Sequence, residues 1–177
     1  LKAVGLDAVA IDHVRNKDAK LGTFMSLDLL TSEGVETLFV LLNDPNLVYV
    51  HMAPPCGTAT RAREIRRRDG PDPQPLRSEQ RPDGLEGLQG TDALKVKSAN
   101  QLYELCAKVF KLLHDKGVPC TIENPKRSYF WLTSWISNLL SSLDSTRCSF
   151  VDFDVCMHGG NRDKKTRLLT ANIDMSS

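Results

Sequence analysis

Two residues with chemically reactive side chains follow apolar segments, at positions typical of strand ends. Cys56 comes directly after Pro54 and Pro55, which end the apolar segment 47–53. The prolines fix φ and turn the chain out of a sheet, and Gly57 permits a close approach of a ligand to the backbone. A thiol held in this way can act as a nucleophile. A buried structural cysteine is the alternative interpretation.

Glu123 ends a second apolar segment, residues 118–123, and is followed by Asn124 and Pro125. A carboxyl group at this position can donate a proton to a bound substrate. A solvated carboxylate, or a cap of the following helix, is the alternative. Because the carboxyl ends of parallel strands meet at one edge of a sheet, Glu123 and Cys56 are predicted to lie close together.

Two aspartates also stand in predicted strands or at their ends. Asp12 closes the short apolar run 8–11, where an acidic side chain can hold the hydroxyl groups of a ribose. An aspartate that forms a turn is the alternative. Asp28 lies in residues 24–30, a second and weaker strand-like segment. Polar groups therefore gather where a ligand of such a sheet would bind.

The composition changes abruptly after Cys56. Residues 54–90 contain six of the nine prolines and seven arginines, which is typical of a long loop or an insertion with a functional reason. Five arginines fall within residues 60–68 and are opposed only by Glu64, so the local net charge is +4. This density favours contacts with phosphate groups, and a solvated run of charges is the alternative. The five are Arg61, Arg63, Arg66, Arg67 and Arg68.

The segments that must position these residues alternate between strand-like and helix-like patterns. Helices are predicted at residues 33–42, 94–116 and 128–143, the second with apolar residues at helical spacing and a glycine at its end. Apolar runs predict strands at residues 8–11, 24–30, 47–53, 118–123, 149–156 and 166–173. This order is typical of an open, doubly wound, Rossmann-like α/β sheet.

The composition excludes several classes of protein. The chain has 177 residues, 41% of them hydrophobic, which suits one domain, and its net charge of +1 excludes a uniformly basic nucleic-acid-binding protein. No run approaches the roughly 20 apolar residues of a membrane span. Five cysteines without a C-x-x-C pair favour reduced thiols and an intracellular location. The spacing of Cys148, Cys156 and His158 fits no common zinc pattern, so no metal is predicted.

The order of these motifs resembles that of the DNA cytosine-5 methyltransferases. Pro54-Pro55-Cys56 is similar to the Pro-Cys motif of that family, and Glu123-Asn124-Pro125 is similar to its Glu-Asn motif. The longer pattern Ala-Pro-Pro-Cys-Gly-Thr, with Arg-Ala-Arg after it, also resembles methyltransferase-like domains of eukaryotic retroelement and protist proteins.

This resemblance implies a reaction on cytosine in DNA, with S-adenosylmethionine as the cofactor. The base would be flipped out of the duplex, and Cys56 would add to its carbon 6. Glu123, in the motif that includes Asn124, would donate or share a proton at nitrogen 3, and Arg167 would help to hold the base and Glu123. Carbon 5 would then receive the methyl group.

The resemblance also assigns binding residues. The strand end at residues 10–13 looks like the ribose-binding strand of the family, and Leu27-Asp28-Leu29 is similar to its segment near the adenine. The implied cofactor-binding residues are Asp12, His13, Asp28, Leu29 and Pro54. The arginines of residues 61–68 would contact DNA phosphates, together with Lys165 of the segment Lys165-Thr166-Arg167, which resembles the arginine-containing strand of the family.

The family pattern further implies that residues 1–177 are a fragment of a larger catalytic domain. The first strand with its glycine-rich cofactor motif would precede Leu1, the target-recognition region would follow Ser177, and residues 58–92 would be the Arg/Pro/Gly-rich catalytic-loop insertion. The expected location is the nucleus if the organism is eukaryotic.

Two other functions stay open at this point. One is a catalytically inactive methyltransferase relic that binds nucleic acid within a mobile-element polyprotein. The other is a cysteine hydrolase that uses Cys56 with His51 or His158 as its base. His51 is five residues upstream of Cys56 on the same predicted strand, which is a poor position for a base.

Overall fold

The computed structural model describes residues 5, 7–13, 23–66, 68–154 and 165–173. The chain divides into two compact units, residues 1–47 and 48–177, and each has its own β-sheet. It is a mixed α/β protein with both parallel and antiparallel strand pairs, which confirms the predicted α/β class. No helix within the described ranges is both long and apolar enough to cross a membrane.

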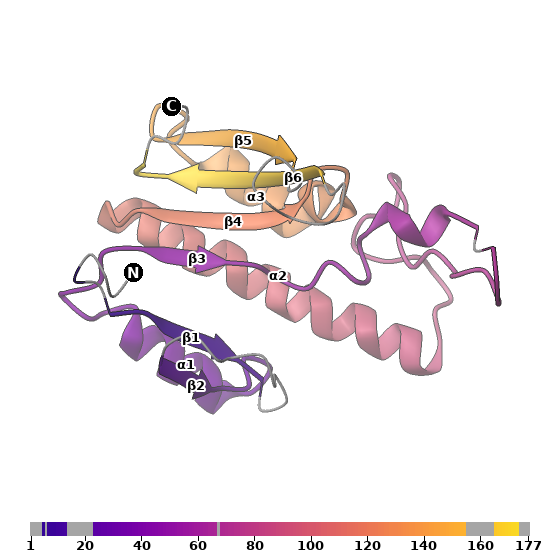
Figure 1. Cartoon of the computed structure of the whole chain (residues 1–177), viewed down its shortest axis with the longest axis horizontal. Coiled ribbons are helices and arrows are strands. Elements are labelled where there is room, and N and C mark those ends of the chain that lie inside the picture. Colours follow the sequence, from indigo (N-terminus) through magenta and orange to yellow (C-terminus); the bar gives the residue numbers. More distant parts are fainter. Residues whose placement is uncertain (1–4, 6, 14–22, 67, 155–164, 174–177) are drawn as a thin grey trace. The chain divides into compact units, whose positions relative to one another are not determined.

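The described residues of the first unit form two short parallel strands and one helix (Figure 1). β1 (Val9–Asp12) pairs with β2 (Thr23–Ser26), and α1 (Ser32–Leu41) follows. The helix begins where predicted because the Thr31 hydroxyl accepts a hydrogen bond from the Gly34 N–H at 3.1 Å. Gly34 is required here, since a Cβ would lie 2.0 Å from the carbonyl oxygen of Asp28. The predicted strand at residues 24–30 is shorter than expected, because the chain turns at residues 29–31.

The second unit contains a four-stranded sheet in the order β3-β4-β6-β5 (Figure 1). Its strands are β3 (Val50–Met52), β4 (Cys120–Pro125), β5 (Cys148–Asp154) and β6 (Lys165–Ala171). β3 runs parallel to β4, whereas β6 is antiparallel to both of its neighbours. The four strands predicted from the apolar runs of this unit are therefore present.

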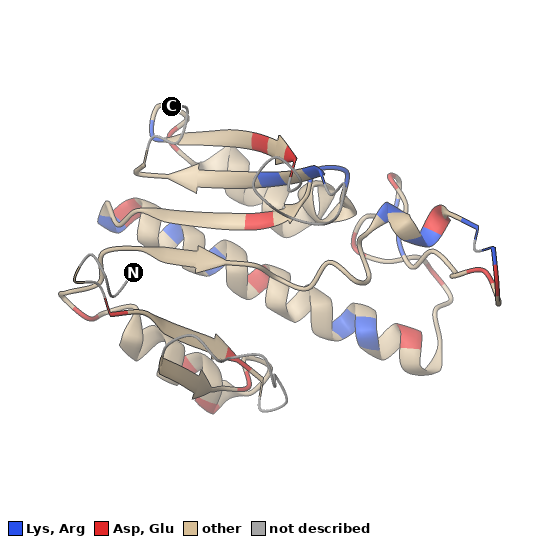
Figure 2. Ribbon diagram, viewed as in Figure 1, with Lys and Arg blue, Asp and Glu red and all other residues tan. Residues whose placement is uncertain are grey.

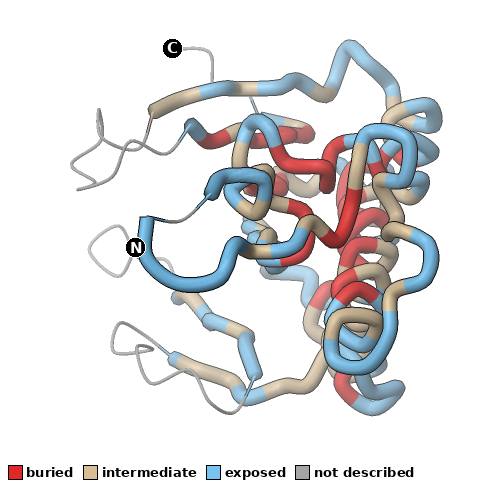
Figure 3. Tube along the Cα trace, turned by 90° about the vertical axis from the view of Figure 1, so that its right-hand side faces the viewer, coloured by how far each residue is buried: buried red, intermediate tan, exposed pale blue. Residues whose placement is uncertain are grey.

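Two helices of the second unit lie against one face of this sheet (Figure 1). α2 (Gly90–Lys116) is longer at its start than predicted and ends at Gly117, whose φ of +74° is the left-handed conformation that a helix C-cap favours. α3 (Ser134–Ser142) packs against α2. Figure 3 shows the buried residues gathered along these helices and the strands beside them. The fully buried side chains include Tyr103, Phe110, Leu113, Ile122, Phe130 and Ile136.

The prediction of one continuous helix at residues 128–143 is wrong. A 3-10 helix, η3 (Tyr129–Leu132), precedes α3, and Thr133 separates the two with an extended backbone at ψ 150°. The buried Thr133 hydroxyl donates to the carbonyl oxygen of Phe130 at 2.7 Å, which favours the break. As a result Trp131 is buried, as expected for a core residue, but Trp135 is only half-buried.

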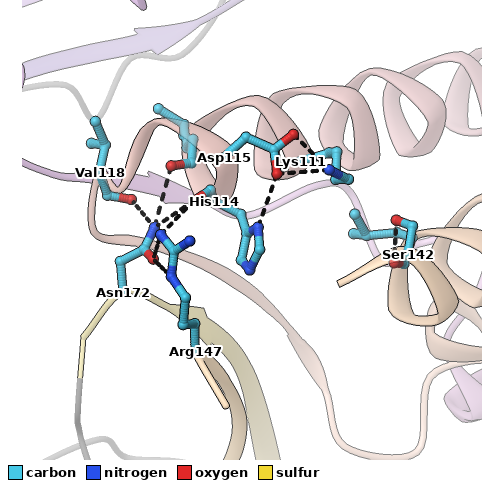
Figure 4. A network of polar contacts seen from close by, with 9 residues as sticks. Lys111, His114, Asp115, Val118, Ser142, Arg147 and Asn172 are labelled. Carbon is cyan, nitrogen blue, oxygen red and sulfur yellow. Dashed lines mark hydrogen bonds and ion pairs between the residues drawn. The ribbon is translucent and has the colours of Figure 1, made fainter. Parts of the chain in front are cut away.

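A polar network fixes the end of α2 to the sheet (Figure 4). Asn172, which follows β6, donates from Nδ2 to the carbonyl oxygens of Leu113 at 3.2 Å and Val118 at 3.0 Å. Arg147 donates to the Asn172 Oδ1 at 3.0 Å and to the carbonyl oxygen of His114 at 2.8 Å. These bonds satisfy carbonyl groups that a helix end leaves without a partner. They also tie the C-terminal end of α2 to residues that flank β5 and β6.

Candidate functional site

The strand ends that carry Cys56 and Glu123 are neighbours in the sheet of the second unit. In the parallel pair, His51 lies opposite Thr121 and Met52 lies opposite Ile122. The strand that leads to Cys56 is therefore the neighbour of the strand that contains Glu123.

Asn124 joins the two strand ends directly. Its side chain is 1% exposed, and Nδ2 donates to the carbonyl oxygen of Pro54 at 3.1 Å. Trp131 of η3 donates from its indole nitrogen to the carbonyl oxygen of Pro125 at 2.9 Å, which fixes the end of β4. The geometry makes Asn124 a link between β4 and the turn that carries Cys56.

Glu123 faces the opposite side of the sheet from Asn124, because successive side chains of a strand alternate. It is half-buried and shares its face with His51 and Thr121. The His51 Nδ1 lies 2.8 Å from the Thr121 hydroxyl, and the Tyr49 hydroxyl lies 2.6 Å from the same oxygen. Desolvation lowers the pKa of His51, and the negative charge of Glu123 opposes this shift. Glu123 is thus within electrostatic range of an imidazole.

The Cys56 thiol is free and half-buried in a tight turn. The carbonyl oxygen of Cys56 accepts hydrogen bonds from the N–H groups of Ala59 and Thr60, both at 2.9 Å. The Arg63 guanidinium donates to the carbonyl oxygen of Gly57 at 2.8 Å. The two other cysteines described on α2 and β4 are buried: burial raises the pKa of the Cys106 thiol strongly and that of Cys120 to about 12. Both are less suited than an exposed thiol to act as nucleophiles.

Arg167 does not lie beside Glu123. It sits opposite Asn124 and Asp152 in the antiparallel pairs of β6, so its side chain is on the Asn124 face of the sheet. It donates to both carboxylate oxygens of Asp152, at 2.7 and 2.9 Å, and its guanidinium lies 4.9 Å from the centre of the Phe150 ring. These hydrogen bonds lower the pKa of Asp152 to about 2. The structure thus pairs Arg167 with a carboxylate other than the predicted one.

Figure 2 marks the basic residues of the loop after Cys56 in blue. By their contacts and exposure, the arginines of residues 61–68 divide into two kinds. Arg61 and Arg63 belong to the 3-10 helix η2 (Arg61–Glu64) and hold the loop together. Arg61 donates from Nε to the carbonyl oxygen of Arg127 at 3.1 Å and stacks 4.4 Å from the centre of the Tyr129 ring. Arg63 donates to two carbonyl oxygens, those of residues 57 and 74.

The other arginines of residues 61–68 are open to solvent where they are described. The Arg66 side chain is 93% exposed and lies 4.0 Å from Asp72, and Arg68 is exposed. Arg67 lies outside the described residues. Lys165 is also exposed, and its carbonyl oxygen accepts a hydrogen bond from the Lys126 N–H at 2.9 Å.

Sequence reasoning missed two groups of residues near the site. Lys126 and Arg127 are exposed and follow directly on Glu123-Asn124-Pro125, and their adjacency to this motif could have revealed them. Arg77 and Tyr103 are buried beside the Cys56 turn. Because Arg77 lies within a run of loop residues, no sequence signal distinguishes it from the exposed arginines.

The cofactor-binding residues predicted in the first unit do come together. The Asp12 Oδ1 accepts a hydrogen bond from the His13 N–H at 2.7 Å, and the His13 Nε2 lies 3.8 Å from the Asp28 carboxylate. The Asp28 Oδ1 accepts from the Leu30 N–H at 2.9 Å, and Leu29 is half-buried. Two carboxylates are therefore fixed at one end of the β1–β2 pair. Pro54 belongs to the second unit.

The hollow described in the second unit lies away from Cys56 and Glu123. A hollow of about 450 Å³ lies between residues 83–88, α2 and Trp135, but neither Cys56 nor Glu123 lines it. Within the described ranges, no three His, Cys, Asp or Glu side chains gather as a metal site requires. Cys156 and His158 lie outside those ranges.

Comparisons with models of protein families, with curated proteins and with solved structures find no match to this chain.

Proposed function

We propose that the chain is a DNA cytosine-5 methyltransferase-like domain that transfers a methyl group from S-adenosylmethionine to carbon 5 of cytosine through a covalent adduct with Cys56. The observation that carries this proposal is the hydrogen bond from Asn124 to Pro54. This hydrogen bond ties the turn that carries the partly exposed Cys56 thiol to the strand that carries the half-buried Glu123 carboxyl group. Addition of a nucleophile to a flat ring, assisted by a proton donor, needs a thiol and a carboxyl group near the same ring.

The fold supports the same proposal. Both reactive groups lie near the carboxyl ends of adjacent parallel strands, Glu123 within β4 and Cys56 four residues after β3, and ligands of doubly wound sheets bind at such ends. The finer fold that this proposal implies is a Rossmann-like methyltransferase sheet.

The proposed reaction starts on a cytosine that is flipped out of the duplex. Cys56, as a thiolate, would form a bond to carbon 6, and the displaced electron pair of the ring would reach nitrogen 3. Glu123, in its protonated form, would donate a proton there, so that no full negative charge develops on the ring. Carbon 5 becomes nucleophilic and receives the methyl group that S-adenosylmethionine supplies. Loss of the carbon 5 proton to a base then breaks the carbon–sulfur bond, releases Cys56 as a thiolate and returns the nitrogen 3 proton to Glu123.

The residues of the first unit fit the cofactor. The carboxylates of Asp12 and Asp28 are each held by a backbone N–H and stay partly exposed, which suits hydrogen bonds from the hydroxyl groups of a ribose. His13, within 3.8 Å of Asp28, and Leu29 would complete this end of the site. Pro54 is assigned to the cofactor by the motif alone.

DNA contacts are assigned to basic side chains that do not hold the protein together. Arg66, Arg68 and Lys165 are exposed, as is Arg127 beside the Glu-Asn-Pro motif. Exposed guanidinium and ammonium groups contact phosphates and give salt-dependent binding.

Covalent trapping tests the proposal. A duplex that contains 5-fluorocytosine should form a stable adduct with the protein in the presence of S-adenosylmethionine, because fluorine at carbon 5 blocks the final elimination. Cys56→Ala should abolish the adduct, whereas Cys148→Ala, which removes another half-buried free thiol, should keep it. An adduct that survives Cys56→Ala, or none from folded wild-type protein that binds both DNA and cofactor, would overturn the proposal.

One observation favours a second function, that of an inactive relic that binds nucleic acid. The ion pair between Arg167 and Asp152 keeps the expected base-holding cation on the face of the sheet opposite Glu123. This alternative predicts salt-dependent binding of DNA without any adduct.

A further inference from the structure

An arginine of the loop insertion is buried beside the Cys56 turn. Arg77 is 1% exposed, and its guanidinium donates to the Thr58 hydroxyl at 3.0 and 3.3 Å and to the carbonyl oxygen of Pro82 at 2.8 Å. No ion pair joins it to a carboxylate in the part of the chain that the structure describes. Burial therefore lowers the pKa of Arg77, and a cation in such a place needs all of these hydrogen bonds.

Tyr103 of α2 connects this arginine to the residue before Cys56. The Arg77 guanidinium lies 5.1 Å from the centre of the Tyr103 ring, which is fully buried. The Tyr103 hydroxyl donates to the carbonyl oxygen of Pro55 at 2.7 Å and lies 3.5 Å from the Thr58 hydroxyl. Burial raises the pKa of Tyr103, and a charge on Cys56 adds to that shift, so the thiol lies within electrostatic range of the phenol.

The cluster therefore holds the Cys56 turn at two points. Tyr103 binds the residue immediately before Cys56, and Arg77 binds Thr58, two residues after it. The carbonyl oxygen of Cys56 accepts hydrogen bonds from the N–H groups of Ala59 and Thr60, which closes the turn just beyond Thr58. A short turn fixed on both sides leaves its central side chain few orientations.

We propose that Arg77 and Tyr103 are positioning residues that fix the orientation of the Cys56 thiol toward the substrate. This inference rests on the proposed function only for the reaction that the thiol performs. It gives the loop insertion a second role besides DNA contact: one of its arginines is built into the support of the nucleophile.

Two rates measured on the same variants test this inference. Tyr103→Phe removes only the hydroxyl group, and Arg77→Lys retains a charge and a donor but loses the two-pronged contact with Thr58. Loss of either contact should lower the rate of adduct formation at saturating DNA by about tenfold, a difference of roughly 1.4 kcal/mol in the barrier, with little change in the Kd for DNA. The same variants should let iodoacetamide alkylate Cys56 several-fold faster, because the turn is held less firmly.

Mass spectrometry of the Cys56 and Cys148 peptides separates positioning from a general loss of structure. A purely structural role would raise alkylation of both cysteines in parallel. Tyr129→Phe is a matched control for alkylation, because it removes another buried phenol whose hydroxyl donates to Glu64 rather than to the Cys56 turn.

The outcomes are distinguishable. Slower adduct formation with faster alkylation of Cys56 alone supports the inference, and unchanged rates, or parallel changes at both cysteines, overturn it. If wild-type protein forms no adduct, the proposed function fails, and the alkylation ratio still decides whether Arg77 and Tyr103 hold the thiol.

Discussion

The side-chain amide of Asn124 donates a hydrogen bond of 3.1 Å to the carbonyl oxygen of Pro54 and so joins the ends of two parallel strands. The amide is buried, and its bond fixes the distance between the turn of Cys56 and the strand of Glu123. Asn124 therefore affects the site by holding the backbone at Pro54, two residues before Cys56.

Asn124→Ala is expected to lower the free energy of unfolding by about 1–3 kcal/mol, since it removes a buried hydrogen bond and leaves the Pro54 carbonyl without this donor. Urea denaturation measures the loss. Asn138→Ala, which changes an exposed residue of α3 in the same unit, serves as the control and should stay within about 0.5 kcal/mol of wild type. Equal stabilities of the two variants would contradict the role of Asn124.

The ion pair between Asp152 and Arg167 should make part of the free energy of unfolding depend on pH. Its hydrogen bonds lower the pKa of Asp152 from 3.8 to about 2, so the carboxylate stabilises the fold above its ordinary pKa and loses this effect as the pH falls toward 2. Asp152→Asn should cost about 1–2 kcal/mol at pH 7, because the pair is partly exposed. The difference between variant and wild type should shrink between pH 4 and pH 2 in chemical denaturation, and a constant difference would disagree.

The two kinds of loop arginine should give different results in DNA binding. Arg66→Ala with Arg68→Ala should reduce the dependence of log K on log salt by about one unit for each lost phosphate contact, without loss of stability. Arg61→Ala should instead lower the thermal midpoint, because Arg61 holds the loop to residues 127 and 129. Fluorescence anisotropy over a series of salt concentrations measures the first effect. An unchanged salt dependence in the double variant would remove the loop from the DNA interface.

Asn172 provides a test of how the sheet is held to α2. Its φ is +58°, and its side chain binds three carbonyl oxygens and Arg147 (Figure 4). Asn172→Ala should destabilise the protein by about 1 kcal/mol more than Asn172→Gly, because only the alanine adds the cost of the left-handed backbone. Thermal denaturation of both variants gives the comparison, and a glycine variant no more stable than the alanine variant would contradict it.

The features that could be predicted from the sequence are those set by local pattern. The helix end at Gly117 follows from glycine conformation, and the strands before Cys56 and around Glu123 follow from apolar runs; the structure has all three, although β3 ends at Met52 and β4 continues to Pro125. The break at Thr133 could not be predicted, because its cause is a hydrogen bond made by a buried hydroxyl within an otherwise helical pattern.

The remaining differences depend on contacts between distant residues. Arg167 pairs with Asp152 because the register between β5 and β6 places the two residues opposite each other. This register cannot be predicted from the sequence of either strand alone. The burial of Arg77 depends on a helix that begins thirteen residues later in the chain and brings Tyr103 beneath it. Composition alone could not separate that arginine from its exposed neighbours.

The central claim is that Cys56 is the nucleophile in a covalent reaction with cytosine. The most direct measurement is peptide mapping by mass spectrometry after incubation with a 5-fluorocytosine duplex and S-adenosylmethionine. We expect the modified nucleotide on the peptide that contains Cys56, with none on the Cys148 peptide and a strongly reduced yield in Glu123→Gln. A modified nucleotide on another residue, or a folded and DNA-bound protein without any adduct, would contradict the account.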